Sequence, residues 1–220
     1  MNYSLMKQVL DLVEQFESGL SQATTVGSSI ESFKRWVAVN YHGENADNAP
    51  DWEGKEKGRS ADSVINTLIT HMNRYAKSYS RAAILGSDFS SQEDFIYLIS
   101  LKAFGEMSKT DLIKRNVHEK PVGIQVINRL ITKGWVNQTP SKIDKRSTVL
   151  KITHKGIQAL ESRMGKIRQA TSLVTGDLTH YEKMELIRLL TKLNDFHQPI
   201  YERNIEPEDL LNEALKDKRG

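Results

Sequence analysis

Side chains that can read DNA gather on one side of the segment "VHEKPVGIQVINRLITKGW", residues 117–135. When the segment is projected as a helix at about 100° per residue, one arc carries amide, hydroxyl and guanidinium groups. This arc consists of Pro121, Gln125, Asn128, Arg129 and Thr132. Gln and Asn amides pair with adenine edges, and Arg pairs with guanine or phosphate. The pattern suits a helix in the major groove, although an ordinary solvated helix surface has a similar composition.

The opposite arc of this segment is apolar and is expected to pack on a core. Its members are Val122, Val126, Ile127, Leu130 and Ile131. Pro121 in the first turn and Gly134 just beyond the last turn mark the ends of the helix. The preceding stretch "MSKTDLIKRN" predicts a shorter helix capped by Ser108. Two such helices joined by a tight turn form a helix-turn-helix.

A second group of charged side chains follows in "SKIDKRSTVLKITHKG", residues 141–156. The turn "SKIDKR" separates two short β-prone runs, "WVNQTP" and "STVLKIT", which predicts a β-hairpin. Such a charged turn is either a plain surface loop or a wing that reaches into a nucleic-acid groove. Its position directly behind a helix-turn-helix favours the wing.

The charge of the chain is concentrated around these two segments. Residues 102–168 carry fifteen Lys and Arg against five acids, a net charge of +10. The rest of the chain carries 16 basic and 23 acidic residues, a net charge of −7, so the overall +3 conceals a basic middle with acidic flanks. This asymmetry is typical of a module that binds a polyanion.

Several classes of protein are disfavoured by the composition. The chain has 220 residues and no cysteine, which removes disulfides, thiolate nucleophiles and zinc-ribbon sites. It has no apolar run near the roughly 20 residues of a membrane-spanning helix, and its start does not resemble a signal peptide, so we expect a cytoplasmic protein without a membrane partner. The six histidines are scattered without paired helical spacing. We therefore expect no enzyme, no metal site and no cofactor.

The remaining periodicity predicts a mainly α protein with one small β-hairpin. Helices are expected over residues 4–20, from 28 or 29 to 39, from Ser60 to about Leu85, within 87–104, after Thr153, within 178–196 and within 204–215. The polar stretch "NYHGENADNAPDWEGKEKGRS", residues 40–60, reads as a linker or long loop. The predicted division is a helical extension with linker over 1–59, a winged-helix domain with long dimerisation helices over 60–198, and a tail with a short helix over 199–220.

Three of these motifs, in this order, resemble the MarR family of winged-helix transcription regulators. They are the helix ending "INRLITKGWV", the wing tip "DKRS" and the strand-to-helix junction "LKITHKG". The resemblance covers residues 60 to 198. It implies a homodimer that presents two recognition helices to a pseudo-palindromic operator in double-stranded DNA. It also implies sequence-specific transcription regulation, with room for a small-molecule effector between the dimer helices and the winged helix.

The resemblance assigns roles to individual residues. Those assigned to DNA are Ser108, Lys109, Thr110, Lys120, Pro121, Gln125, Asn128, Arg129, Lys133, Lys142, Lys145, Arg146 and Ser147. Lys120, Pro121, Gln125 and Asn128 would meet base edges, and Arg146 would enter the minor groove. Asp144 would stabilise the wing by pairing with Arg129 or Arg146. The chain departs from the family at Pro121, Val122 and Gly123, where Ser or Thr is common.

Two alternatives remain beside the regulator. The apolar start of the recognition helix and the long N-terminal extension favour a winged-helix dimer that binds protein, as an interaction or assembly module with little specific binding to DNA. A regulator that senses a metal ion is the other alternative.

Overall fold

The structure is a computed structural model that describes residues 3–20, 29–40, 50–140 and 148–219. The chain divides into two compact units, Met1–Val64 and Ile65–Gly220. Among the described residues, no helix combines the length and the apolar character that crossing a bilayer would require. The same part of the chain holds no cluster of three side chains suited to a metal ion.

The first unit contains two short helices, α1 (Tyr3–Leu20) and α2 (Ile30–Asn40), and the 3-10 turn η2 (Lys55–Lys57). The helices meet through three aromatic rings: the centroid of Phe16 lies 5.4 Å from that of Phe33 and 5.7 Å from that of Trp36. Phe16 is buried, whereas a row of apolar side chains on α1 is exposed: Tyr3, Leu5, Met6, Val9 and Leu10. Both helices confirm the sequence prediction.

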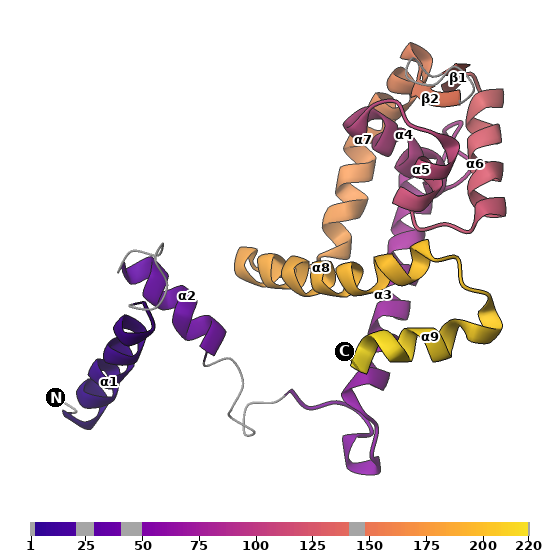
Figure 1. Ribbon diagram of the computed structural model, residues 1–220. Helices are drawn as coiled ribbons and strands as arrows, with labels where there is room; N and C mark the ends of the chain where they lie inside the picture. Colours follow the sequence, from indigo (N-terminus) through magenta and orange to yellow (C-terminus); the bar gives the residue numbers. More distant parts are fainter. Residues whose placement is uncertain (1–2, 21–28, 41–49, 141–147, 220) are drawn as a thin grey trace. The chain divides into compact units, whose positions relative to one another are not determined.

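The second unit holds the winged helix (Figure 1). Its elements are α3 (Ala61–Ile84, which begins in the first unit), α4 (Gln92–Phe104), α5 (Lys109–Arg115), α6 (Lys120–Thr132), β1 (Val136–Pro140), β2 (Thr148–Ile152), α7 (His154–Val174), α8 (His180–Glu202) and α9 (Pro207–Arg219). The two strands pair antiparallel, with Val136 opposite Ile152. The expected fold class, mainly α with a small hairpin, is confirmed. The helix α8 runs through residue 198, where the predicted domain ended, to Glu202.

Local signals in the sequence fix the ends of these elements. The Ser108 hydroxyl accepts a hydrogen bond from the Asp111 N–H and caps α5, and the Thr153 hydroxyl accepts from the Gly156 N–H and caps α7. Gly134 follows α6 with a φ of 70°, a left-handed conformation that glycine adopts without strain. The predicted caps are therefore confirmed, and they place the hairpin directly after α6.

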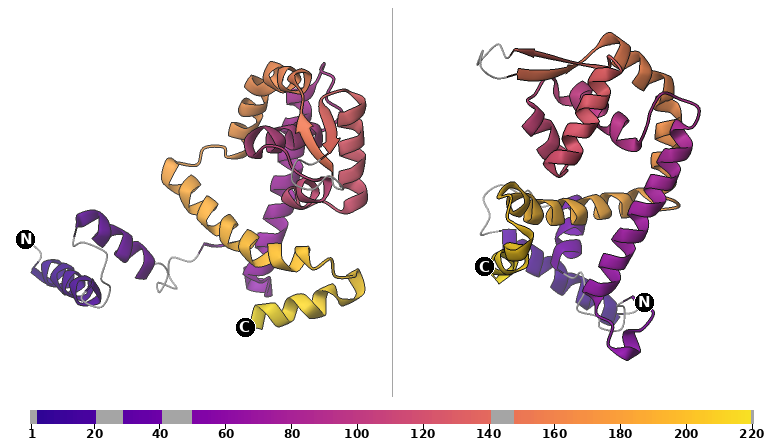
Figure 2. Two further views of the ribbon diagram at one scale, coloured as in Figure 1. Left: turned by 45° about the horizontal axis from the view of Figure 1, so that its top comes forward. Right: turned by 90° about the vertical axis from the view of Figure 1, so that its right-hand side faces the viewer.

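One core joins α4, α5, α6, the hairpin and α7. The side chains with no exposed surface in this core are Tyr97, Leu98, Leu112, Ile127, Leu130, Leu150 and Leu160. Backbone hydrogen bonds in both directions between Met107 and Leu150 tie the segment between α4 and α5 to β2. The hairpin is thus anchored at its base, and it projects away from the helices in the right-hand view of Figure 2.

The orientation of α6 depends on the carboxylate of Asp94, which is completely buried on α4. Arg129 Nε donates to its Oδ1 at 2.7 Å and Nη2 donates to the same oxygen, while Lys133 Nζ lies 3.3 Å from Oδ2. The Ser90 N–H donates to Oδ2 at 2.8 Å. A buried carboxylate is tolerated only with such partners, so these bonds hold α6 against α4.

A glycine sets how closely α6 approaches its neighbours. A Cβ atom on Gly123 would lie 2.4 Å from Ile113 Cγ1 on α5 and 2.9 Å from the Tyr97 hydroxyl oxygen on α4. Gly123 therefore occupies the centre of the packed face. Val122, which the sequence placed on that face, is instead 43% exposed. The reason is geometric: Val122 lies about 90° around the helix from the centre of the buried arc, at the edge where Arg129 and Lys133 also lie.

We predict that Gly123→Ala lowers the free energy of unfolding by about 1 to 3 kcal/mol, because the added methyl group overpacks the contact between α6 and α5. The matched control is Gly165→Ala in α7, where a Cβ atom would have no neighbour within 4 Å. There alanine should add about 0.5 to 1 kcal/mol through its higher helix propensity. Urea denaturation followed by circular dichroism measures both. An equal gain in the two variants would contradict the close approach at Gly123.

We also predict that Arg129→Met costs roughly 2 to 3 kcal/mol of stability, because it removes the charge-assisted bonds to a buried carboxylate. Lys102→Met is the control, since Lys102 and Glu161 form a pair at 2.9 Å whose side chains are 44% and 58% exposed. That pair should contribute less than about 1 kcal/mol. Urea denaturation measures the loss of unfolding free energy in both variants. Small and equal losses would contradict the structural role of Arg129.

Candidate nucleic-acid interface

The outer face of α6 presents the side chains that the sequence assigned to base edges. Lys120, Pro121, Gln125 and Asn128 are all exposed. Gln125 and Asn128 lie three residues apart and so project from adjacent turns on one face. The structure leaves both amides open to solvent, next to the exposed Val122. The face offers donors and acceptors together with one apolar surface, which matches the mixture of base edges and thymine methyl groups in a major groove.

Two cations that the sequence assigned to DNA are used inside the domain. Arg129 binds Asp94 and also donates from Nη2 to the Ser91 hydroxyl at 3.2 Å. Lys133 donates to the Ser90 hydroxyl at 2.9 Å and to the Asp88 carbonyl, and its Nζ lies 4.8 Å from the centroid of the Trp135 ring. The predicted partner of Arg129, Asp144, lies outside the described residues. No local pattern in the sequence marks Asp94 as the partner, because Arg129 and Lys133 lie 35 and 39 residues away along the chain.

The helix α5 precedes α6 in the helix-turn-helix. The Ser108 hydroxyl accepts from the Asp111 N–H at 3.1 Å and donates to the Asp111 carboxylate at 2.7 Å, so capping occupies it. Lys109 is half-buried and Thr110 is exposed. Of the three residues assigned here to backbone phosphates, Thr110 is therefore the most accessible.

The residues assigned to the wing tip lie outside the described ranges: Lys142, Asp144, Lys145, Arg146 and Ser147. The strands that carry the tip are described. Gln138 Nε2 donates to the Thr148 hydroxyl at 3.0 Å across the hairpin, and Pro140 pairs with Thr148 as the last pair of the register. The hairpin therefore leads the chain to the tip with a fixed register.

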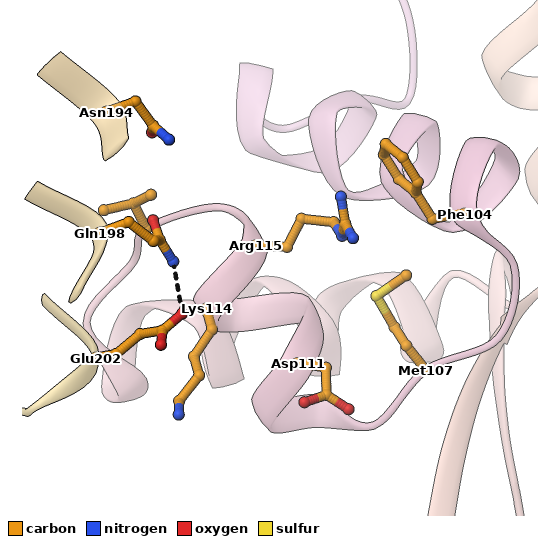
Figure 3. Close-up of a pocket in the computed structure, with 9 residues that line it drawn as sticks. Phe104, Met107, Asp111, Lys114, Arg115, Asn194, Gln198 and Glu202 are labelled. Atoms are coloured by element: carbon orange, nitrogen blue, oxygen red, sulfur yellow. Dashed lines mark hydrogen bonds between the residues drawn. The ribbon is translucent and has the colours of Figure 1, made fainter. Parts of the chain in front are cut away.

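A cavity of about 600 Å³ lies between the winged helix and α8. Figure 3 shows Asn194, Gln198 and Glu202 of α8 on one side and residues of α4, α5 and the segment between them on the other. The second wall consists of Phe104, Met107, Asp111, Lys114, Arg115 and Val117. The guanidinium carbon of Arg115 lies 3.8 Å from the centroid of the Phe104 ring. No sequence motif marked these residues, because the cavity forms between elements about 80 residues apart.

Comparison with known proteins agrees with this geometry. Residues 89–156 match the family model of a winged helix DNA-binding domain. The HTH-type transcriptional repressor NicR of Pseudomonas putida is 27% identical over 101 residues, which are 46% of this chain and 64% of the relative. The match thus spans less than two thirds of that curated relative.

Two solved structures show the same fold. One describes regulation of DNA binding of Bordetella bronchiseptica BpsR by 6-hydroxynicotinic acid; it has a TM-score of 0.56 and 20% identity, covering 67% of this chain and 99% of the other. The second is a mutant of E. coli MarR complexed with operator DNA, with a TM-score of 0.55 and 22% identity, covering 66% and 99%. The chain therefore contains a winged helix DNA-binding domain, and its fold is similar to that of these two regulators.

Proposed function

We propose that the chain is a DNA-binding transcription regulator that reads a pseudo-palindromic operator as a homodimer. The observation that carries this proposal is the outer face of α6, whose polar side chains are exposed while its inner face is packed on the core. This face lies within the segment of net charge +10. A helix of this kind, placed second in a helix-turn-helix, is the element that enters a major groove. The similarity to a repressor and to an operator complex supports the same function.

The contacts divide into three groups under this proposal. Gln125 and Asn128 read base edges, with Lys120 and Pro121 at the start of the helix, and the exposed Val122 meets a thymine methyl group. Lys109 and Thr110 bind backbone phosphates, as do Lys142, Lys145 and Ser147 of the wing, while Arg146 enters the minor groove. Arg129 and Lys133 belong to a third group, which sets the orientation of α6 through Asp94.

Exposed apolar side chains on α3 and α8 support the homodimer. On α3 they are Ile65, Leu68, Ile69, Met72 and Tyr75, and on α8 they are Leu186, Ile187, Leu189, Leu190 and Leu193. Patches of this extent are rare on the surface of a protein that stays monomeric. A second copy of the chain would cover both helices and hold two α6 helices at a fixed separation, which is what two half-sites require.

The cavity between α8 and the winged helix supports a small-molecule effector. It combines the Phe104 ring with the Lys114 ammonium group, amides from Asn194 and Gln198, and a volume of about 600 Å³. We propose that it takes a small aromatic acid. BpsR, which shares the fold, is regulated by 6-hydroxynicotinic acid.

We predict that Gln125→Ala weakens binding by about 1 to 3 kcal/mol at one base-pair position and changes nonspecific affinity little. A selection from a random pool of duplexes gives the operator, and fluorescence anisotropy on single-base variants of it measures the loss. Gln169→Ala, at an exposed glutamine of α7, is the control. Equal losses on every sequence would mean that Gln125 only positions the helix.

The same titration distinguishes the DNA-binding regulator from the alternative, a winged-helix dimer that binds protein as an assembly module. The exposed Val122 and the apolar row of α1 favour that alternative. Binding that neutralises phosphates weakens as salt rises. Absence of binding, or an affinity that does not respond to salt, would overturn the regulator and leave the assembly module.

We predict that Leu189→Glu converts the dimer to monomers, because it places a charge in the apolar surface that the partner covers. The control is Arg188→Glu, at an exposed residue that lies opposite the centre of this apolar surface on the circumference of the helix. Sedimentation velocity measures both variants. A monomeric wild-type chain, or equal dissociation of the two variants, would contradict the proposed interface.

A further inference from the structure

A hydrogen bond joins α8 to the turn of the helix-turn-helix. The hydroxyl of Tyr201, in the last turn of α8, donates to the backbone carbonyl of His118 at 2.7 Å. His118 lies two residues before the start of α6, between Val117 and the N-cap residue Glu119. Val117 also lines the cavity. A single residue of α8 therefore binds the segment from which the recognition helix begins.

The side chain of His118 is held from the opposite direction by α4. Its Nδ1 is hydrogen-bonded to the Tyr97 hydroxyl at 2.9 Å, its Nε2 lies 3.3 Å from Glu93 Oε2, and its ring stacks on that of Tyr97. Burial raises the pKa of the Tyr97 hydroxyl, and Glu93 raises it further. Burial also raises the pKa of Tyr201. Both hydroxyls thus stay protonated at physiological pH, so the Tyr201 hydroxyl is available as a donor.

The backbone of this turn needs such restraints. Val117 has a φ of 50°, in the left-handed region that a β-branched residue rarely enters. A residue is found there only where its surroundings hold it. The N–H groups of Val117 and His118 donate to carbonyls at the end of α5. Two further elements hold the turn from outside it, α4 through the His118 ring and α8 through the His118 carbonyl. A displacement of α8 removes one of them.

We propose that Tyr201 is a positioning residue that couples the cavity to the recognition helix, an inference that rests on the proposed function. Asn194, Gln198 and Glu202 form the α8 wall of the cavity, and Tyr201 lies in the same last turn of α8 as Glu202. An occupant that moves this wall away from α5 lengthens the bond from Tyr201 to His118. The turn then loses its fixed geometry, and α6 no longer presents Gln125 and Asn128 in the arrangement that fits the operator.

Hydrogen exchange on the full chain tests the restraint without DNA. Tyr201→Phe removes only the hydroxyl, and Tyr181→Phe, at an exposed tyrosine of the same helix, is the control. In the Tyr201 variant, the amides of residues 117–124 should exchange faster by about fivefold, the factor that corresponds to one ordinary intramolecular hydrogen bond. Amides of the buried part of α4 should keep their rates. Unchanged exchange in residues 117–124 would overturn the restraint.

A double-mutant cycle tests the coupling through DNA affinity. Gln198→Trp fills the cavity from its α8 wall and replaces an occupant, while Gln198→Ala removes the same amide without filling it. With Tyr201 present, the Trp variant should lower operator affinity by about tenfold, within the usual range for coupled sites. In the Tyr201→Phe background, it should add almost nothing, because the link is already absent.

The outcomes separate this inference from the proposed function. Equal factors in the two backgrounds, or an equal effect of the Ala and Trp variants, would overturn the coupling while leaving DNA binding intact. A wild-type chain that binds no DNA would overturn the proposed function, and the exchange experiment would still decide whether Tyr201 holds the turn.

Discussion

The carboxylate of Asp94 is the charge around which the winged helix is arranged. It has no exposed surface, so the free energy of removing it from water must be offset by partners inside the domain. Those partners are Arg129 in the last turn of α6, Lys133 at the C-cap of the same helix, and the Ser90 N–H. Because both cations leave α6 from one side, rotation of the helix about its axis would separate them from Asp94. The contacts of Arg129 and Lys133 with Asp94 therefore fix the rotation of α6, and this rotation decides which side chains face outward.

The pairing with Asp94 reduces the positive charge that residues 102–168 can offer to a polyanion. The segment from 102 to 168 has a formal net charge of +10, yet two of its cations are engaged with a buried acid that lies outside the segment. The charge available to a polyanion is therefore smaller than the composition suggests. The available positive charge also lies at a different place on α6. Lys120 stays exposed at the start of the helix, whereas Arg129 and Lys133 near its end are paired with Asp94 of α4.

The sequence predicted the parts of the fold that depend on neighbouring residues. Ser108, Thr153 and Gly134 act within four positions of themselves, so capping rules located the helix ends correctly. The bond between Asp94 and Arg129 spans 35 residues, and no local pattern distinguishes an arginine that binds a buried acid from one that binds phosphate. Periodicity likewise misplaced Val122, since Gly123 adds no hydrophobicity to a projection although it occupies the centre of the packed face. The sequence also did not predict the cavity, because its residues are distant along the chain and meet only where α8 lies against the winged helix.

The anchoring of the hairpin has a consequence for its folding. Backbone bonds between Met107 and Leu150 and the pairing from Val136 to Pro140 fix the register of the strands at the base, independently of the tip. Seven residues separate the last pair, Pro140 and Thr148. A substitution at the base of the hairpin should therefore cost folding free energy, because these bonds and pairs are made there.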